Sequence, residues 1–126
     1  FVKKHRLNSV EQIKNLPLID LSNMDNIWKL WTKQSDIKQF NSDHKLTFNS
    51  YESSIQAACQ GLGLVLAMLP IENALIHNNL LVKPFNVSVP FKHALYAVYR
   101  QEDENRHDIT CFLNWLMQSP NLTGIK

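Results

Sequence analysis

The middle of the chain changes the spacing of its apolar residues in an order typical of a strand, a helix and a second strand. Residues 46–48 alternate apolar and polar side chains, as in a strand. Residues 51–59 repeat apolar side chains at helical spacing, with Ser50 placed to cap that helix and Gly61 placed to end it. The run 64–69 is uniformly apolar, which predicts a parallel strand buried on both faces.

The same reading extends to both ends of the chain. Ser9 and Gln12 stand at the spacing of a capping box, which predicts a short helix to about Asn15. Pro17 ends that helix. The other predicted elements are a strand at 18–21, a helix holding Ile27, Trp28, Leu30 and Trp31, a helix at 71–76 opened by Pro70 and closed by Asn78 and Asn79, a short strand at 80–82, a β-rich run at 94–99 and an amphipathic helix at 109–117.

Size and composition place these elements in one α/β unit. The 126 residues are 44% hydrophobic and 19% charged, without repeats or low-complexity linkers. A chain of this length buries roughly two-thirds of its unfolded surface, so it needs no metal or disulfide to fold. We expect Cys59 and Cys111 to be buried thiols in a reducing compartment such as the cytoplasm, although sequence leaves a disulfide open.

Charge and hydropathy exclude several partners. A net charge of +2 is too small for a nucleic-acid surface, and residues 3–6 are the one basic cluster. There is no apolar run of about 18 residues and no apolar signal region near the amino terminus, so we expect neither a membrane partner nor export. The chain starts at Phe1 rather than Met, from which we expect a piece of a longer protein.

No pattern of catalytic or metal-binding residues stands out. The five histidines lie in polar surroundings without a second ligand at a useful spacing, so we assign no metal. Asp43 and His44 are adjacent on an extended segment and therefore point apart. Gly61 and Gly63 precede a strand and lack a third glycine, so we assign no dinucleotide cofactor and no other cofactor. The serines at 50, 53 and 54 lack a nucleophile elbow.

What remains is a binding site at the carboxyl ends of the predicted strands. Parallel α/β sheets bind ligands there, and the free N–H groups at the start of the helix at 51–59 favour an anion. The simpler interpretation, that these residues are only caps and turns, stays open. The candidate ligand-binding residues are Ser22, Asn23, Asn49, Ser50, Tyr51, Leu69 and Pro70.

Longer stretches resemble a known family. The sequence "NSVEQIKNLPLI", the Trp28–Trp31 pair, "FNSYESSIQAACQGLGLVLAMLP", "LLVKPF", "ALYAVYR" and "FLNWL" follow one another. Together they resemble the effector-binding domain of LysR-type transcriptional regulators, in the branch of the glycine-cleavage activator and the β-lactamase regulators. The resemblance covers nearly the whole chain and is sharpest at residues 57–66.

The resemblance implies a three-layer, Rossmann-like subdomain of the periplasmic-binding-protein type II fold. Its sheet would be mainly parallel with an antiparallel crossover strand. Residues 9–85 would form most of the second subdomain and residues 92–101 the crossover strand, while the helix at 107–118 would belong to the first subdomain. The rest of the first subdomain and a winged helix-turn-helix, through which alone the parent protein would bind DNA, would lie outside the chain.

The resemblance also implies a mechanism based on ligand binding and not on a chemical reaction. A small-molecule effector would close two subdomains and shift a tetramer on DNA, and this chain, holding half of the cleft, would bind it poorly. The apolar face of the last helix would lack its sheet, so we expect a homo-oligomer of this chain, either a dimer or a swap. The alternatives are a periplasmic-type solute-binding protein and, less favoured, a small α/β enzyme using Asp20, His44 or Cys59.

Overall fold

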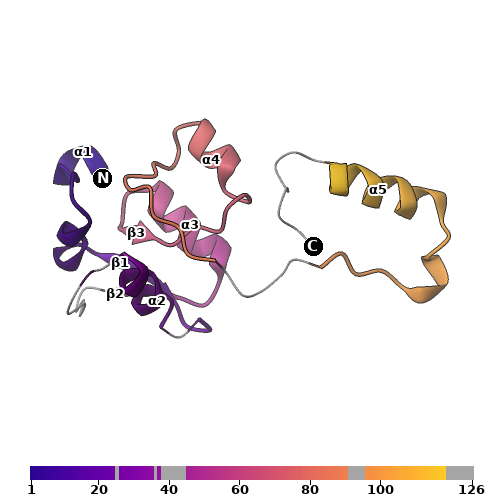
Figure 1. Ribbon diagram of the computed structural model, residues 1–126, viewed down its shortest axis with the longest axis horizontal. Coiled ribbons are helices and arrows are strands. Elements are labelled where there is room, and N and C mark those ends of the chain that lie inside the picture. Colours follow the sequence, from indigo (N-terminus) through magenta and orange to yellow (C-terminus); the bar gives the residue numbers. More distant parts are fainter. Residues whose placement is uncertain (25, 36, 38–44, 91–95, 119–126) are drawn as a thin grey trace.

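The computed structural model shows an α/β body followed by a separate helical segment (Figure 1). It describes residues 1–24, 26–35, 37, 45–90 and 96–118. In chain order the elements are α1 (Val2–His5), the 3-10 helix η1 (Val10–Asn15), β1 (Leu18–Leu21), α2 (Ile27–Gln34), β2 (Lys45–Phe48), α3 (Tyr51–Cys59), β3 (Leu64–Val65), α4 (Asn73–His77), the 3-10 helix η2 (Gln101–Asp103) and α5 (His107–Gln118).

A three-stranded parallel sheet organises the body. The strand order is β2-β1-β3, with Leu21 opposite Phe48 on one side of β1 and Leu18 opposite Leu64 on the other. Successive side chains of a strand point to opposite faces, and neighbouring Leu18 and Ile19 are only 0% and 2% exposed. The central strand is therefore buried on both faces, which confirms the predicted α/β class with a parallel sheet.

Helix α3 and the Trp28 side chain of α2 pack against this sheet. Helix α3 contacts all three strands and buries Ser54, Ile55 and Ala57. Trp28 of α2 is 3% exposed, packs with Leu18 and Ile13, and donates from Nε1 to the Ile19 carbonyl over 2.9 Å. Because the indole N–H, its only polar group, is hydrogen-bonded inside the core, Trp28 is a packing residue.

Two helix-end predictions are confirmed. The Ser50 hydroxyl accepts from the Ser53 N–H at the start of α3, and Gly61 ends the helix with φ at +77°. At η1 the Gln12 side chain accepts from the Ser9 N–H over 3.0 Å, as in a capping box, while the Ser9 hydroxyl donates to Glu11. That turn is a 3-10 helix rather than an α-helix.

The predicted third strand is shorter than expected. Strand β3 covers Leu64–Val65 only, and Ala67 and Leu69 are exposed, so a buried strand over 64–69 was wrong. The Met68 N–H donates to the Tyr51 hydroxyl, a side chain of α3, and thus does not extend a ladder. After the turn that follows, α4 begins at Asn73, two residues later than predicted, and ends at His77 with Asn78 as its C-cap, in keeping with the predicted closure.

Two further strand predictions fail. Residues 80–82 form no strand, because the N–H groups of Leu80 and Leu81 both donate to the Leu75 carbonyl and so close α4. Residues 96–100 form no strand either, and Tyr96 is 80% exposed, while residues 92–95 of the expected crossover lie outside the described residues.

The helix predicted near the end of the chain is present as α5. No residue of α5 is buried, and Phe112 and Trp115 are 53% and 63% exposed. Cys111 on this helix is exposed and Cys59 is half-buried, both as free thiols, so the expectation of two buried cysteines was wrong. Among the described residues, no helix combines the length and apolar character needed to cross a membrane.

Candidate functional site

The ends of β1 and β2 place the first group of predicted site residues side by side. The Ser22 N–H donates to the Phe48 carbonyl over 2.9 Å, one step beyond the paired Leu21 and Phe48. Ser22 and the residue after it, Asn23, therefore lie next to Asn49, and all three are exposed. Hydroxyl and amide groups from two strand ends consequently share one edge of the sheet.

The amino terminus of α3 adds backbone donors to that edge. The Ser50 hydroxyl and carbonyl accept from the Ser53 and Ser54 N–H groups over 3.4 and 3.1 Å. The first N–H groups of a helix have no intrahelical acceptor, which leaves those of Tyr51 and Glu52 directed outward from the first turn. Such a terminus attracts an anion through its N–H groups and the helix dipole.

Tyr51 connects this edge to the segment that follows β3. Its hydroxyl accepts from the Met68 N–H over 2.9 Å. Burial raises the pKa of the Tyr51 phenol to about 12; the Met68 N–H opposes this rise and the Glu72 carboxylate adds to it. The phenol is therefore neutral at ordinary pH and held among protein groups.

The structure thus brings the predicted residues together in two linked sets. Ser22, Asn23, Asn49 and Ser50 share the β1–β2 edge, and Tyr51 reaches from that edge to Met68, the residue before Leu69 and Pro70. That the seven residues hold an effector stays a prediction.

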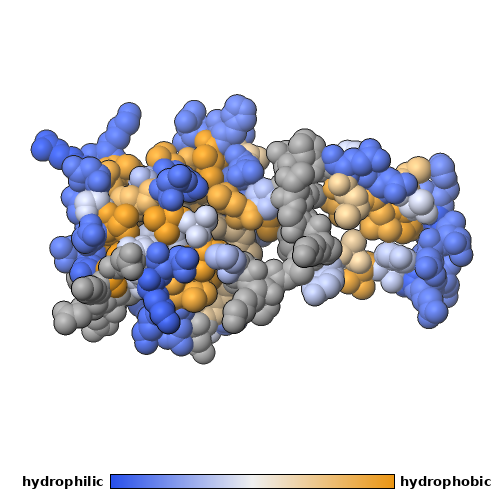
Figure 2. Space-filling view, in the orientation of Figure 1, coloured by the Kyte–Doolittle hydropathy of each residue, from blue (hydrophilic) through white to orange (hydrophobic). Residues whose placement is uncertain are grey.

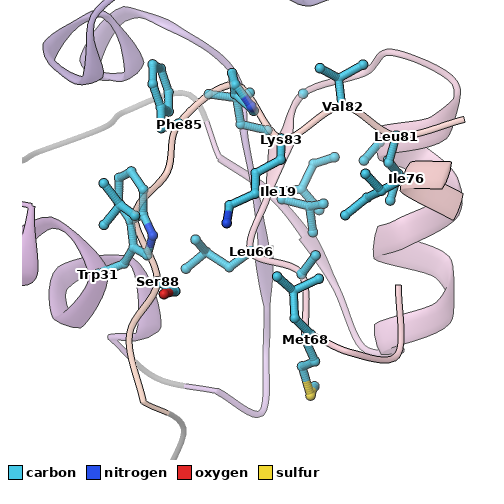
Figure 3. Close-up of a pocket in the computed structure, with 18 of the residues that line it drawn as sticks. Ile19, Trp31, Leu66, Met68, Ile76, Leu81, Val82, Lys83, Phe85 and Ser88 are labelled. Atoms are coloured by element: carbon cyan, nitrogen blue, oxygen red, sulfur yellow. The ribbon is translucent and has the colours of Figure 1, made fainter. Parts of the chain in front are cut away.

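An apolar groove of about 1120 Å³ lies beside the sheet in the described body. Figure 3 shows Ile19, Leu66 and Met68 facing it across from Trp31 and Phe85. Of the seven predicted site residues, Tyr51, Leu69 and Pro70 line the groove, whereas the four polar residues of the β1–β2 edge do not. Figure 2 shows apolar side chains gathered on this part of the body and again on the α5 segment.

Sequence reasoning missed two charged residues near these surfaces. Glu72 is 6% exposed and lies beside the Tyr51 hydroxyl. Nothing in the periodicity of the segment 71–76 marks this glutamate as buried. Lys83 lines the groove and donates to the Asn86 side chain over 3.2 Å.

Two of the three residues considered for catalysis, Asp20 and Cys59, lie within the described structure. The Asp20 carboxylate pairs with Lys45 over 3.4 Å, and Cys59 stands at the far end of α3. His44, together with its neighbour Asp43, lies outside the described residues. In the part of the chain that the structure describes, no three His, Cys, Asp or Glu side chains are grouped to hold a metal.

Comparison with known proteins agrees with the architecture. Residues 2–120 match the model of the LysR substrate binding domain, so the chain belongs to that family. Over 104 residues it is 29% identical to the glycine cleavage system transcriptional activator of Escherichia coli strain K12, and equally to that of strain O157:H7. That match covers 82% of this chain and 33% of the relative's length.

A solved structure shows the same fold. The effector domain of the transcriptional regulator AmpR of Pseudomonas aeruginosa superimposes with a TM-score of 0.58 at 20% identity, over 65% of this chain and 40% of that one. The predicted family, its branch and the periplasmic-binding-protein type of fold are thereby confirmed.

Proposed function

We propose that this chain senses a small carboxylate-bearing metabolite for a LysR-type transcriptional regulator and does not transform it. The site would be the edge formed by Ser22, Asn23, Asn49 and the amino terminus of α3. The observation that carries this proposal is the Ser22 N–H to Phe48 carbonyl hydrogen bond, because it fixes two strand ends beside the free N–H groups of α3. Family membership supplies the regulatory context.

The charges around the site favour a small, singly charged ligand. The first turn of α3 offers N–H donors and a positive dipole end, but Glu52 places an exposed carboxylate in the same turn. A ligand with one carboxylate gains the N–H contacts at little repulsive cost. A dicarboxylate would bring a second negative charge toward Glu52.

The chain would supply one wall of the effector cleft. Residues 9–85 would be the second subdomain, and residues 92–101 and the helix at 107–118 would lead into the first, with Leu69 and Pro70 at the mouth of the cleft. Closure of two subdomains around the metabolite would favour one arrangement of the regulator, a tetramer that binds DNA through a winged helix-turn-helix. The matched relatives are transcriptional activators by name, in keeping with a sensing role.

Binding of matched acids and amides tests the proposal. We would titrate the protein by calorimetry with acetate and acetamide, with glycine and glycinamide, and with malonate. We expect the monocarboxylates to bind, with Kd in the millimolar range for half of a cleft, and the amides and malonate to bind more weakly. Equal binding of acetate and acetamide would refute an anion site.

One variant pair locates the binding. Asn49→Ala removes an exposed amide at the site, whereas Asn105→Ala removes an exposed amide that precedes α5. We expect the first to weaken acetate binding about fivefold, the effect of about 1 kcal/mol for one hydrogen bond, and the second to leave it unchanged. Equal effects of both variants would contradict the assignment.

A further inference from the structure

The Tyr51 hydroxyl makes a hydrogen bond within the protein rather than only with solvent. The hydroxyl accepts from the N–H of Met68, 17 positions along the chain. The Glu72 carboxylate, which is 6% exposed, lies near enough to the phenol to raise its pKa. A phenol oxygen can accept a hydrogen bond, and here it accepts from a backbone group of the protein.

Met68, which donates to the Tyr51 hydroxyl, and Glu72, whose carboxylate lies near it, are the two ends of one turn. The Glu72 N–H donates to the Met68 carbonyl over 3.3 Å, and the Asn73 N–H donates to the Pro70 carbonyl over 3.1 Å. The Ile76 N–H then donates to the Glu72 carbonyl over 3.1 Å, within the start of α4. The Tyr51 hydroxyl therefore holds the turn 68–72, which leads directly into α4.

The backbone of the same residue faces the proposed ligand. Tyr51 is the first residue of α3, and its N–H belongs to the outward-directed first turn. An anion bound there would contact the backbone of Tyr51, whose side chain is hydrogen-bonded to the turn 68–72. One residue thus joins the site to α4 through a single rigid side chain.

We infer that Tyr51 is a positioning residue of the effector site: its hydroxyl holds the turn 68–72, and with it Leu69 and Pro70, against the amino terminus of α3. Occupation of that terminus is transmitted through Tyr51 to the turn. The inference rests on the proposed function and changes one part of it, because the Tyr51 side chain acts on the effector through the turn and not by direct contact.

The test compares Tyr51→Phe with Tyr96→Phe, a control at a tyrosine that is 80% exposed. Without ligand, we expect hydrogen exchange of the Met68 amide to accelerate about tenfold in Tyr51→Phe, the equivalent of one lost hydrogen bond, and to stay unchanged in the control. Unchanged Met68 exchange in Tyr51→Phe would overturn the inference. Should Tyr51→Phe not fold, the wild-type response to acetate still tests the inference: shifts confined to residues 51–53, with none at residues 68–72, would overturn it.

The response to acetate distinguishes this role of Tyr51 from a merely structural one. In the wild type, acetate should shift the backbone amide signals of residues 51–53 and also of residues 68–72. In Tyr51→Phe, the shifts at 51–53 should remain with about fivefold weaker affinity, while those at 68–72 disappear. If both groups of shifts persist in Tyr51→Phe, this inference is overturned and the proposed function is not. Absence of acetate shifts at 51–53 in the wild type would overturn the proposed function and this role of Tyr51 together.

Discussion

Gly63 stands where the chain enters β3, and replacing it with alanine should destabilise the fold. A Cβ atom at this position would lie 2.7 Å from the Pro17 carbonyl oxygen and 3.2 Å from Ile19 Cγ1. Ordinary contacts begin at 3.4 Å, so the strand must move by about 0.7 Å. The obstructing oxygen is fixed, because it accepts the Leu64 N–H over 2.9 Å.

The size of the effect follows from three contributions. Overpacking beside a buried strand costs about 1–3 kcal/mol. Stretching the hydrogen bond from Leu64 to Pro17 costs about 0.5–1.5 kcal/mol more. Alanine has less conformational entropy than glycine in the unfolded chain, which offsets about 0.4–1 kcal/mol of this destabilisation. We expect Gly63→Ala to lower the free energy of unfolding by about 0.5–4 kcal/mol, with a central value of about 2 kcal/mol.

Urea unfolding followed by tryptophan fluorescence measures this change, since Trp28 is buried in the folded state. Gly61→Asn is the matched control two residues earlier: its φ of +77° suits asparagine, and the nearest atom to its Cβ is Phe1 Cβ at 4.0 Å. We expect the control to cost less than about 1 kcal/mol. The reasoning is refuted if Gly63→Ala stays within about 0.5 kcal/mol of the wild type or if both variants lose equal stability.

Three other outcomes follow from the structure. Trp28→Phe should lower the free energy of unfolding in urea by about 1–3 kcal/mol, because it removes the buried hydrogen bond from Nε1 to the Ile19 carbonyl and shrinks a buried side chain; an unchanged midpoint would contradict this. The pKa of Tyr51 is raised from 10.0 to about 12, so the neutral phenol stabilises the fold below pH 10 and that advantage is lost as pH rises through about 12; the stability difference between wild type and Tyr51→Phe should shrink over this interval, and a constant difference would argue against a buried phenol. The exposed apolar face of α5 should drive dimerisation, so sedimentation should show a concentration-dependent dimer that Phe112→Asp weakens; a monomer at every concentration would rule this out.

Local chemistry explains why the first half of the fold was predictable from sequence. Strand β1, helix α2 and the unit from β2 to the end of α3 were predicted from sequence. In these segments the capping residues, the helix-ending glycine and the spacing of apolar residues all indicate the same elements. Ser50 and Gly61 mark the two ends of α3 without reference to distant residues. The parallel pairing of the three strands then places Ser22 beside Asn49.

Long-range hydrogen bonds explain where sequence failed. The apolar run 64–69 ends as a strand after two residues because a side chain of α3 takes the Met68 N–H. Likewise, Leu80 and Leu81 close α4 instead of joining a sheet. Glu72 is buried close to Tyr51, which lies 21 positions earlier in the chain. The spacing of apolar residues shows which face of an element is buried. It does not show which distant residues that element contacts or hydrogen-bonds.

The account depends on an anion binding at the β1–β2 edge and the start of α3. A map of backbone amide shifts over the whole chain during acetate titration tests this most directly, with acetamide as the neutral reference. We predict the largest acetate-specific shifts at Ser22, Asn23 and residues 49–52. Shifts confined to the apolar groove, around Leu66 and Val82, would contradict it.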